Sequence, residues 1–480
     1  MPQPYPSARA CLLALATAIP LQLSAQNRAS HGGVAALERT LPALMDSGGI
    51  PGLAMAVVDN GRVRWARGFG VRGAPGSGAV DEHTVFEAAS LSKPVLAYAA
   101  LRLADRGVLE LDRPLREYLP LPELAGDPRA RGITARMVLS HTTGLQNERI
   151  GDAPLALAFA PGERFRYSGE GFVYLGRVLE AITGRPLETL MRREVLEPLR
   201  MKRSSFVWRD ALAPNAATGH GGFGDVRTPT RPRAPRPPSS LHTTAHDYAL
   251  FLAAMLRGSG LRPATRAAAF TPAVRVTDGI GWGLGWAVES GARGPLVWHH
   301  GDNSNTGFTS FAIADPARGA ALVYLANSST GLGVVEEVLR RAGGAFAGPH
   351  PAVAWMDRER YDAPTRTVRL ALERRMRTGA AAGIALYREL RASHHAGAFP
   401  ESLLNSLGYR LLAAGKHADA VALFELNAAE FPASANVHDS LGDGYDAAGD
   451  PARAIRSYER SLALDPGNTH AAERIAALRR

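Results

Sequence analysis

Ser90 and Lys93 are the two residues whose types and spacing most directly suggest chemistry. They lie in the segment Phe86-Glu-Ala-Ala-Ser-Leu-Ser-Lys93 at a predicted helix start, where a spacing of three puts two side chains on one face. A serine hydroxyl becomes an effective nucleophile when a neighbouring base takes its proton. A lysine can be that base if burial or nearby positive charge lowers its pKa. Alone, the pattern also fits a helix-capping serine beside an exposed lysine.

The scarcity of lysine adds weight to the catalytic interpretation. The sequence has 55 lysine and arginine residues, and only three of them are lysines: Lys93, Lys202 and Lys416. Arginine cannot serve as a base, because its guanidinium stays protonated. A lysine kept three residues after a serine therefore indicates a function that arginine cannot perform.

Two further segments carry groups suited to the same reaction. Tyr167 lies in a polar turn before a predicted helix, where its phenol can relay a proton to a leaving group, although it could instead only pack on an apolar patch. His299 precedes His300 and Gly301 near a predicted strand end, where a glycine lets backbone N–H groups approach an oxyanion. Adjacent strand residues point to opposite faces, and the sequence has no His-Glu-x-x-His, so we expect no metal here. We expect no cofactor either.

The elements that must position these groups predict one α+β domain over residues 30–345. Two β-like runs flank Asp59-Asn-Gly61, which predicts a hairpin, and strands are predicted again near the other end. Helices are predicted between them, so the sheet must be assembled from distant, mainly antiparallel pieces. The late strands are expected at 284–288, 296–300, 308–314 and 320–325, with helices at 35–46, 91–106, 169–183, 187–195 and 334–342.

Ser90-x-x-Lys93, Tyr167-Ser-Gly169 and His299-His-Gly301 together resemble the three ordered motifs of class C β-lactamases and their relatives. These relatives include D-alanyl-D-alanine carboxypeptidases, D-aminopeptidases and esterases. Segments such as Leu139-Ser-His-Thr-Thr-Gly-Leu145 and Gly283-Leu-Gly-Trp286 are similar as well. The resemblance covers about two thirds of the chain and implies a β-lactamase/transpeptidase-like fold, in which an antiparallel sheet is flanked by helices and carries a helical subdomain.

The resemblance implies a role for each motif residue. Ser90 would form the acyl-enzyme, Lys93 and Tyr167 would share the proton transfers, and His299 would stand where lysine is common. The N–H groups of Ser90 and Asp302, beside Gly301, would form the oxyanion hole. His141 belongs to a loop motif of the family, and we expect a structural role for it.

Two departures from the family pattern bear on the substrate. Gly169 replaces the asparagine that usually holds the substrate's amide group. Without the usual lysine, a substrate carboxylate would meet only His299, which we expect to be partly charged near neutral pH. Both changes favour ester or amide hydrolysis over efficient β-lactam hydrolysis.

The C-terminal region repeats with a period of 34 residues. Leu407-Gly408 recurs as Leu441-Gly442, and Phe424 recurs as Tyr458. Small residues, an aromatic residue and a closing proline at this period resemble the tetratricopeptide repeat, which is built from helix pairs. We expect a linker at 346–370 and an all-α repeat region at 371–480, where the run 380–391 is a degenerate repeat or a docking helix.

The N-terminal residues 1–25 resemble a secretory signal peptide, because Arg9 precedes a short apolar run that ends in small residues. This predicts export to the periplasm or beyond, with no transmembrane segment in the mature chain. The single cysteine, Cys11, lies inside this segment, so the mature chain is expected to lack thiols and disulfides. The net charge of +10 comes with no nucleic-acid-binding motif, and we expect no nucleic-acid partner.

The sequence therefore predicts a serine hydrolase acting on a small ester, amide or D-amino-acid peptide. A catalytically silent scaffold whose repeats bind a protein partner is the alternative, because helical repeats form concave binding surfaces. A weak β-lactamase is the third possibility.

Overall fold

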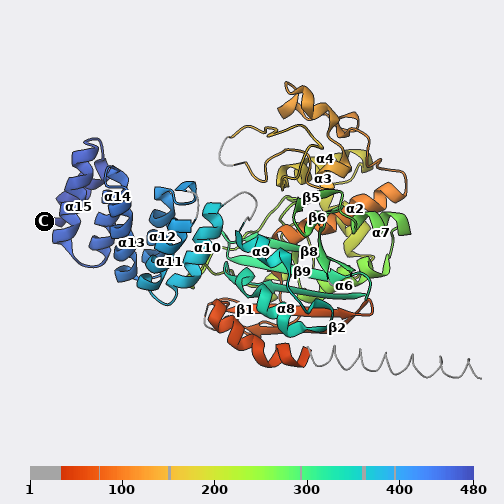
Figure 1. Cartoon of the computed structure of the whole chain (residues 1–480), viewed down its shortest axis with the longest axis horizontal. Helices are drawn as coiled ribbons and strands as arrows, with labels where there is room; N and C mark the ends of the chain where they lie inside the picture. Colours follow the sequence, from red (N-terminus) through yellow and green to blue (C-terminus); the bar gives the residue numbers. More distant parts are fainter. Residues whose placement is uncertain are drawn as a thin grey trace, which may run out of the picture.

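The computed structural model describes residues 34–74, 76–149, 153–291, 294–358, 364–393 and 396–479. The predicted signal peptide lies outside these residues. In the described part, an antiparallel sheet in the order β2-β1-β10-β9-β8-β7-β6-β5 forms the centre of the N-terminal domain, and a helical tail extends to one side (Figure 1). The strands are β1 (Gly52–Asp59), β2 (Arg62–Gly70), β5 (Val274–Thr277), β6 (Ile280–Trp282), β7 (Ala287–Gly291), β8 (Gly294–Asn303), β9 (Phe308–Asp315) and β10 (Ala320–Ala326).

The sheet joins the two ends of the domain, as the sequence predicts. Asn60 and Gly61 both adopt positive φ angles, of 50° and 66°, which make the tight turn between β1 and β2. β1 then pairs with β10, with Leu53 opposite Ala326 and Val58 opposite Ala321. A separate pair of short strands, β3 (Phe86–Glu87) and β4 (His242–Thr243), lies next to the predicted nucleophile.

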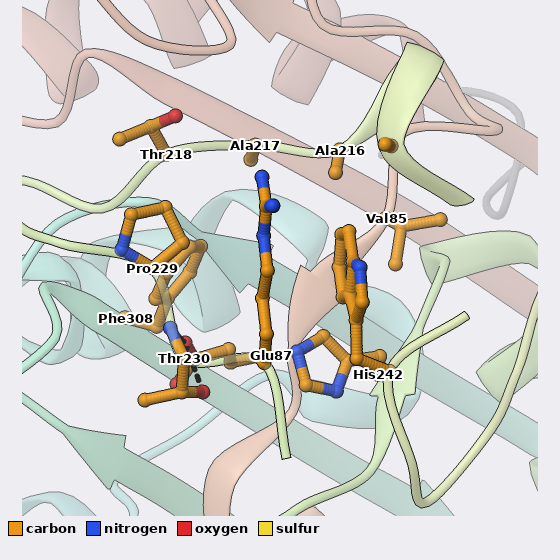
Figure 2. Close-up of a pocket in the computed structure, with 12 residues that line it drawn as sticks. Val85, Glu87, Ala216, Ala217, Thr218, Pro229, Thr230, His242 and Phe308 are labelled. Carbon is orange, nitrogen blue, oxygen red and sulfur yellow. Dashed lines mark hydrogen bonds between the residues drawn. The ribbon is translucent and has the colours of Figure 1, made fainter. Parts of the chain in front are cut away.

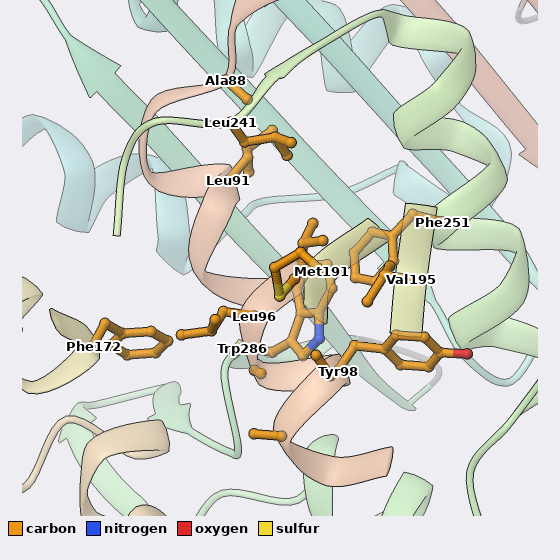
Figure 3. Packing of buried hydrophobic residues seen from close by; sticks show 14 of the residues in the cluster. Ala88, Leu91, Leu96, Tyr98, Phe172, Met191, Val195, Leu241, Phe251 and Trp286 are labelled. Atoms are coloured by element: carbon orange, nitrogen blue, oxygen red, sulfur yellow. The ribbon is translucent and has the colours of Figure 1, made fainter. Parts of the chain in front are cut away.

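Helices cover the sheet and form the subdomain that carries Tyr167. The first helix, residues 34–48, is followed by α2 (Ser92–Asp105), α3 (Ala135–Leu139), α4 (Gly169–Thr183), α5 (Leu187–Met191), α6 (Ala245–Arg257), α7 (Pro263–Ala269) and α8 (Val335–Ala342). After α5, residues Arg192–Leu196 continue as a π-helix. Most residues of α2 are buried, and in the surrounding apolar cluster Leu96 lies on the side of Phe172, while Tyr98 packs against Phe251 near Trp286 (Figure 3). This packing fixes the start of α2, which carries the catalytic candidates.

The tail consists of packed helix pairs whose close contacts explain the 34-residue period. Its helices are α10 (Pro364–Met376), α11 (Ala380–Ser393), α12 (Glu401–Ala413), α13 (His417–Glu430), α14 (Ala435–Ala447), α15 (Pro451–Leu464) and α16 (Thr469–Leu478). A Cβ atom on Gly408 would lie 2.4 Å from the Phe424 ring, and one on Gly442 would lie 2.4 Å from the Tyr458 ring. Each glycine therefore lets an aromatic ring of the next helix pack directly on the backbone.

The predicted linker at 346–370 is the main difference between sequence and structure. Instead of an irregular connection, it contains α9 (Pro351–Arg358) and the beginning of α10. Trp355 on α9 is buried, with its ring 5.9 Å from that of Trp298. The proline- and glycine-rich composition suggested a linker, but burial of this tryptophan against the sheet stabilises a helix there.

The tail also packs on the N-terminal domain. Phe223, from a loop of that domain, is buried in a cluster with Leu372 of α10 and Leu403 of α12. Beside it, the fully buried Glu373 carboxylate pairs with Arg369 and Arg410. No helix among the described residues is long and apolar enough to cross a membrane.

Candidate active site

Ser90 and Lys93 meet at the junction between a short 3₁₀ turn (Ala89–Leu91) and α2. The Lys93 Nζ atom lies 2.9 Å from the Ser90 Oγ atom and donates a second hydrogen bond, 3.1 Å long, to the Pro238 carbonyl oxygen. Ala89, which precedes the serine, has a φ of 50°, a left-handed conformation that a residue with a Cβ adopts only when its surroundings enforce it. The fold thus holds the serine in one fixed orientation, beside the amine.

Lys93 is in an environment that disfavours its charge. Its side chain is 2% exposed, and its Nζ atom lies 4.7 Å from the centre of the Tyr167 ring and 5.9 Å from that of Phe172. Burial lowers the pKa of Lys93 well below its usual value, and the positive charge of Arg236 lowers it further, while Glu148 acts in the opposite direction. The amine can therefore lose its proton and accept one from the Ser90 hydroxyl.

Tyr167 is held in place by the loop that contains His141. The main-chain N–H of Ser168 donates to His141 Nδ1 over 2.9 Å, and the imidazole stacks on the Tyr167 ring with centroids 4.2 Å apart. Burial lowers the pKa of His141 well below its usual value, with the Lys93 charge as the next cause. His141 is thus a neutral imidazole that packs against the phenol ring of Tyr167, which fits the structural role that we expect for it from the sequence.

His299 faces Tyr167 from strand β8, while His300 lies against Trp298 and Trp355. The Nε2 atom of His299 lies 3.5 Å from the Tyr167 hydroxyl, and the Nδ1 atom of the same ring is 2.8 Å from the His300 carbonyl oxygen. A carbonyl only accepts, so Nδ1 carries the hydrogen and Nε2 is free to accept from the phenol.

The expectation that His299 is partly charged near neutral pH is wrong. Complete burial, together with the nearby Lys93 charge, lowers the pKa of His299 to about 3. The sequence showed only the residue type, whereas the pKa depends on the depth at which β8 places the ring. A substrate carboxylate therefore meets no positive charge at this residue.

Gly301 is required by close contact between β8 and the turn that carries Ser90. A Cβ atom at this position would lie 2.4 Å from the Ala88 carbonyl oxygen and 2.3 Å from Ser310 Oγ. Asp302 follows on the same strand, and its carboxylate accepts a 2.9 Å hydrogen bond from the N–H of Ser304. The structure thus brings the Gly301–Asp302 segment against the Ser90 turn, the arrangement that an oxyanion hole between these main chains needs.

Glu87, three residues before Ser90, connects this turn to two other segments. Its buried carboxylate accepts hydrogen bonds from the N–H and hydroxyl of Thr230, from Asn303 at the end of β8 and from Thr306 in the turn that follows. Glu87 and Thr230 border a cavity of about 100 Å³ that His242 also lines (Figure 2). The residues lining this cavity do not include Ser90, so we interpret Glu87 as a support for β3, the strand that leads into the Ser90 turn.

The proline- and arginine-rich segment around 227–238 is part of the site that the sequence did not reveal. The Pro238 carbonyl oxygen accepts a hydrogen bond from Lys93, and the Arg236 charge lowers the pKa of Lys93. Arg236 Nη2 lies 3.7 Å from Glu148 and 3.9 Å from the buried Glu170. Residues 93 and 238 are 145 positions apart, so no local spacing could have shown this contact.

Only in the tail do described residues gather side chains of metal-binding type. Asp439, Asp443 and His470 bring ligand atoms within 4.8 Å of one another. However, Tyr409 and Tyr458 donate to the Asp443 carboxylate over 2.6 and 2.7 Å, and His470 Nδ1 lies 3.0 Å from Asp439. These hydrogen bonds connect α12, α14, α15 and α16, and we interpret the cluster as structural.

Comparison with known proteins separates the same two regions. The Beta-lactamase family profile matches residues 37–345, and the Tetratricopeptide repeat profile matches residues 435–468. Penicillin-binding protein 4 of Amycolatopsis lactamdurans is 27% identical over 334 residues, covering 62% of this chain and 86% of its own length. Protein flp of Staphylococcus aureus strain MRSA252 is 24% identical over 308 residues, covering 59% of this chain and 60% of its own.

A solved structure supports the fold. The octameric penicillin-binding protein homologue from Pyrococcus abyssi superimposes with a TM-score of 0.57 and 23% identity, over 68% of this chain and 80% of its own. The expected fold, an α+β β-lactamase/transpeptidase-like domain followed by an all-helical region with a tetratricopeptide repeat, is confirmed. Because the family profile matches well over half of the sequence, this chain belongs to the beta-lactamase family, the family of serine β-lactamases and penicillin-binding proteins.

Proposed function

We propose that this protein is an acyl-transfer hydrolase that cleaves an ester or amide, including that of a D-amino-acid peptide, through an acyl-enzyme on Ser90. The 2.9 Å approach of the buried Lys93 amine to Ser90 Oγ is the observation that carries the proposal. Among the described residues, no carboxylate lies within ion-pair distance of this amine, and the opposing influence of Glu148 is smaller than that of burial.

In the first half of the reaction, Ser90 Oγ attacks the substrate carbonyl carbon while its proton passes to Lys93 Nζ. The carbonyl oxygen becomes an oxyanion, which the N–H groups of Ser90 and Asp302 would stabilise. The bond to the leaving group then breaks, and the leaving atom takes a proton by way of Tyr167 and Lys93. The product is an ester between the acyl group and Ser90.

In the second half, water attacks the same carbonyl carbon. The amine–phenol pair accepts the water's proton, the bond to Ser90 Oγ breaks, and the serine recovers its hydrogen. His299 accepts a hydrogen bond from the Tyr167 hydroxyl and so orients the phenol between the serine and the leaving group. Because His299 is neutral, it takes part as an acceptor only.

Covalent labelling of Ser90 tests this proposal. A fluorophosphonate probe should attach to the wild-type protein and not to Ser90→Ala, with the modified peptide identified by mass spectrometry. A panel of p-nitrophenyl esters, D-amino-acid amides and nitrocefin then identifies the substrate class, and we expect slow turnover of nitrocefin or none. Failure of several serine-directed probes to label the folded protein would contradict the proposal and favour a silent scaffold.

We also propose that the chain is exported and that its repeats bind a protein partner. The basic and apolar N-terminal segment supports the first point, and the tetratricopeptide match supports the second. Fractionation of expressing cells, with Ser90 labelling as the readout, tests export. Capture of a partner by the full chain tests binding by the repeats. A partner that Ser90→Ala still captures, and that is lost when residues 400–480 are removed, would support it.

A further inference from the structure

Strand β8 presents the candidate site on one face and the helices that lead to the tail on the other. Gly301 lies against the turn that carries the nucleophile, because a Cβ atom on it would be 2.4 Å from the Ala88 carbonyl oxygen. On the opposite face, the rings of Trp298 and His300 lie 5.9 and 6.4 Å from that of Trp355 on α9. Because successive residues of a strand alternate between faces, a displacement of the strand at one face also displaces the residues at the other.

The turn after β8, formed by residues 304–307 and named here the β8–β9 turn, is bonded from two sides. Thr306 Oγ1 donates to the Glu87 carboxylate over 2.8 Å. From the tail, Arg369 Nη2 of α10 donates to Ser304 Oγ over 3.4 Å. The turn is therefore held between the strand that leads to the nucleophile and the first helix of the tail.

The contact with Arg369 reaches the main chain that would line the oxyanion hole. Ser304 is 2% exposed, and its N–H donates to the Asp302 carboxylate over 2.9 Å. Ser304 thus joins the Arg369 guanidinium to the residue whose N–H is expected to stabilise the oxyanion. Because such donors act by being held in place before the reaction, a small displacement of Asp302 lowers the rate.

Arg369 also has a partner within the tail. Its Nη1 atom lies 3.2 Å from Glu373 Oε1, on a carboxylate that is fully buried. Arg410 of α12 pairs with the same carboxylate, and its guanidinium lies 5.6 Å from the centre of the Phe223 ring. Of these two arginines, only Arg369 also bonds to the β8–β9 turn within the described part of the chain. The two guanidinium groups therefore share one carboxylate but differ in their contact with the site.

We propose that Arg369 is a positioning residue of the reaction: it fixes the β8–β9 turn through Ser304 and so holds the Asp302 N–H in the oxyanion hole. The tail is then part of the hydrolase, because its first helix supplies this contact. Arg369 lies outside residues 37–345, the range that the family profile matches. This inference rests on the proposed function and adds to it a residue from the tail.

Steady-state kinetics with p-nitrophenyl butyrate, and the rate constant for labelling of Ser90 by a fluorophosphonate, test the inference in the full chain. Both reactions place negative charge on an oxygen in the oxyanion hole. In Arg369→Ala we expect kcat and the labelling rate constant to fall by about tenfold, with KM within about twofold of the wild-type value, because the stabilisation is lost only in the transition state.

Two further variants separate positioning from a merely structural role. Ser304→Ala keeps the Arg369–Glu373 pair and should show the same fall in both rates, and the double variant should be no slower than the slower single variant. Arg369→Lys, which can still donate to Ser304, should recover part of the rate.

Arg410→Ala is the matched control, because it removes the other guanidinium from Glu373 and leaves the contact with Ser304 in place. It should lower the urea midpoint as Arg369→Ala does, with kcat and the labelling rate constant within about twofold of the wild-type values. Equal rates in Arg369→Ala and Arg410→Ala, or wild-type rates in Ser304→Ala, would overturn this inference and leave the proposed function intact. If only the probe reacts, its rate constants decide. If the ester is not hydrolysed and no probe labels Ser90, the proposed function fails and this inference fails with it.

Discussion

Two buried groups of charged type, one in each region of the chain, are treated in opposite ways by their surroundings. In the catalytic candidate site, Lys93 is enclosed by aromatic rings and one carbonyl, and its pKa falls. At the junction with the tail, Glu373 is fully buried but contacts the guanidinium groups of Arg369 and Arg410. Within the described part of the chain, the first group has no ion-pair partner, while the second has two.

The difference shows that a buried charged group can either become reactive or hold two parts of the chain together, depending on its partners. A buried amine without an opposite charge releases its proton and becomes a base. A buried carboxylate between two arginines keeps its partners in place and joins elements from different parts of the chain. The choice of lysine in one place and arginine in the other follows, because only lysine can deprotonate.

Replacing Lys93 should have the largest effect. Lys93→Arg keeps a positive side chain but cannot accept the serine proton, so we expect kcat to fall by about 10⁴-fold on any ester that the wild type hydrolyses. Lys93→Met, a neutral control of similar length, should lose as much activity while unfolding at a temperature close to that of the wild type. Initial-rate kinetics measure the activity, and thermal denaturation measures the unfolding temperature. Retention of a tenth of the activity by Lys93→Arg would show that the amine is not the base.

Breaking the Glu373 cluster should reduce stability and leave the chemistry largely in place. Arg410→Ala removes one partner from a fully buried carboxylate, and we expect the transition that includes the tail to lose about 3 kcal/mol. Urea denaturation followed by circular dichroism measures the change. The matched control is Arg453→Ala, which breaks an exposed contact with Asp450 and should leave the midpoint nearly unchanged. Equal midpoints for both variants would remove the distinction between the two clusters.

Acid should destabilise the site through His299. Its folded pKa of about 3 lies below the ordinary value of 6.5, so the unfolded chain binds a proton that the folded one refuses. The free energy of unfolding should therefore decrease as pH falls from about 6.5 towards 3. Denaturation midpoints across this range should show a smaller loss for His299→Gln. A variant with the same slope as the wild type would mean that the histidine is charged in the folded state.

The smallest predicted effect is a shift of the pH–rate profile by the charges around Lys93. Arg236 lowers the pKa of the amine, so Arg236→Gln should raise that pKa and move the acidic limb of kcat/KM to higher pH. Glu148→Gln should move it to lower pH. Because both side chains are about half exposed, added salt should reduce each shift. Shifts in the same direction in both variants would contradict this electrostatic interpretation.

Much of the hydrolase region could be predicted because its signals are local. The hairpin follows from Asn60-Gly61, and the expected helix at 169–183 coincides with α4 because Ser168 caps it and Gly184 ends it in a left-handed conformation. Ser90 and Lys93 meet as expected because one helical turn joins them. The structure also brings Tyr167, His299 and Gly301 to this pair, in line with the expectation from the ordered motifs.

What could not be predicted depends on contacts between distant residues. The pKa of His299 depends on how deeply the ring is buried, and the influence of Arg236 on Lys93 depends on a loop that approaches from elsewhere in the chain. The helix in the expected linker depends on the packing of Trp355 against Trp298. Composition indicated a connection there, because proline and glycine are typical of linkers and no local pattern marks a tertiary partner.

The pairing of β1 with β10 has a consequence for how the chain acquires its structure. β1 is synthesised near the start of the domain. Its neighbour β10 is synthesised only after almost all of the domain. Contacts between such distant segments form slowly and leave edges open meanwhile. On the proposal that the chain is exported, the sheet would close only after β10 has followed β1 across the membrane.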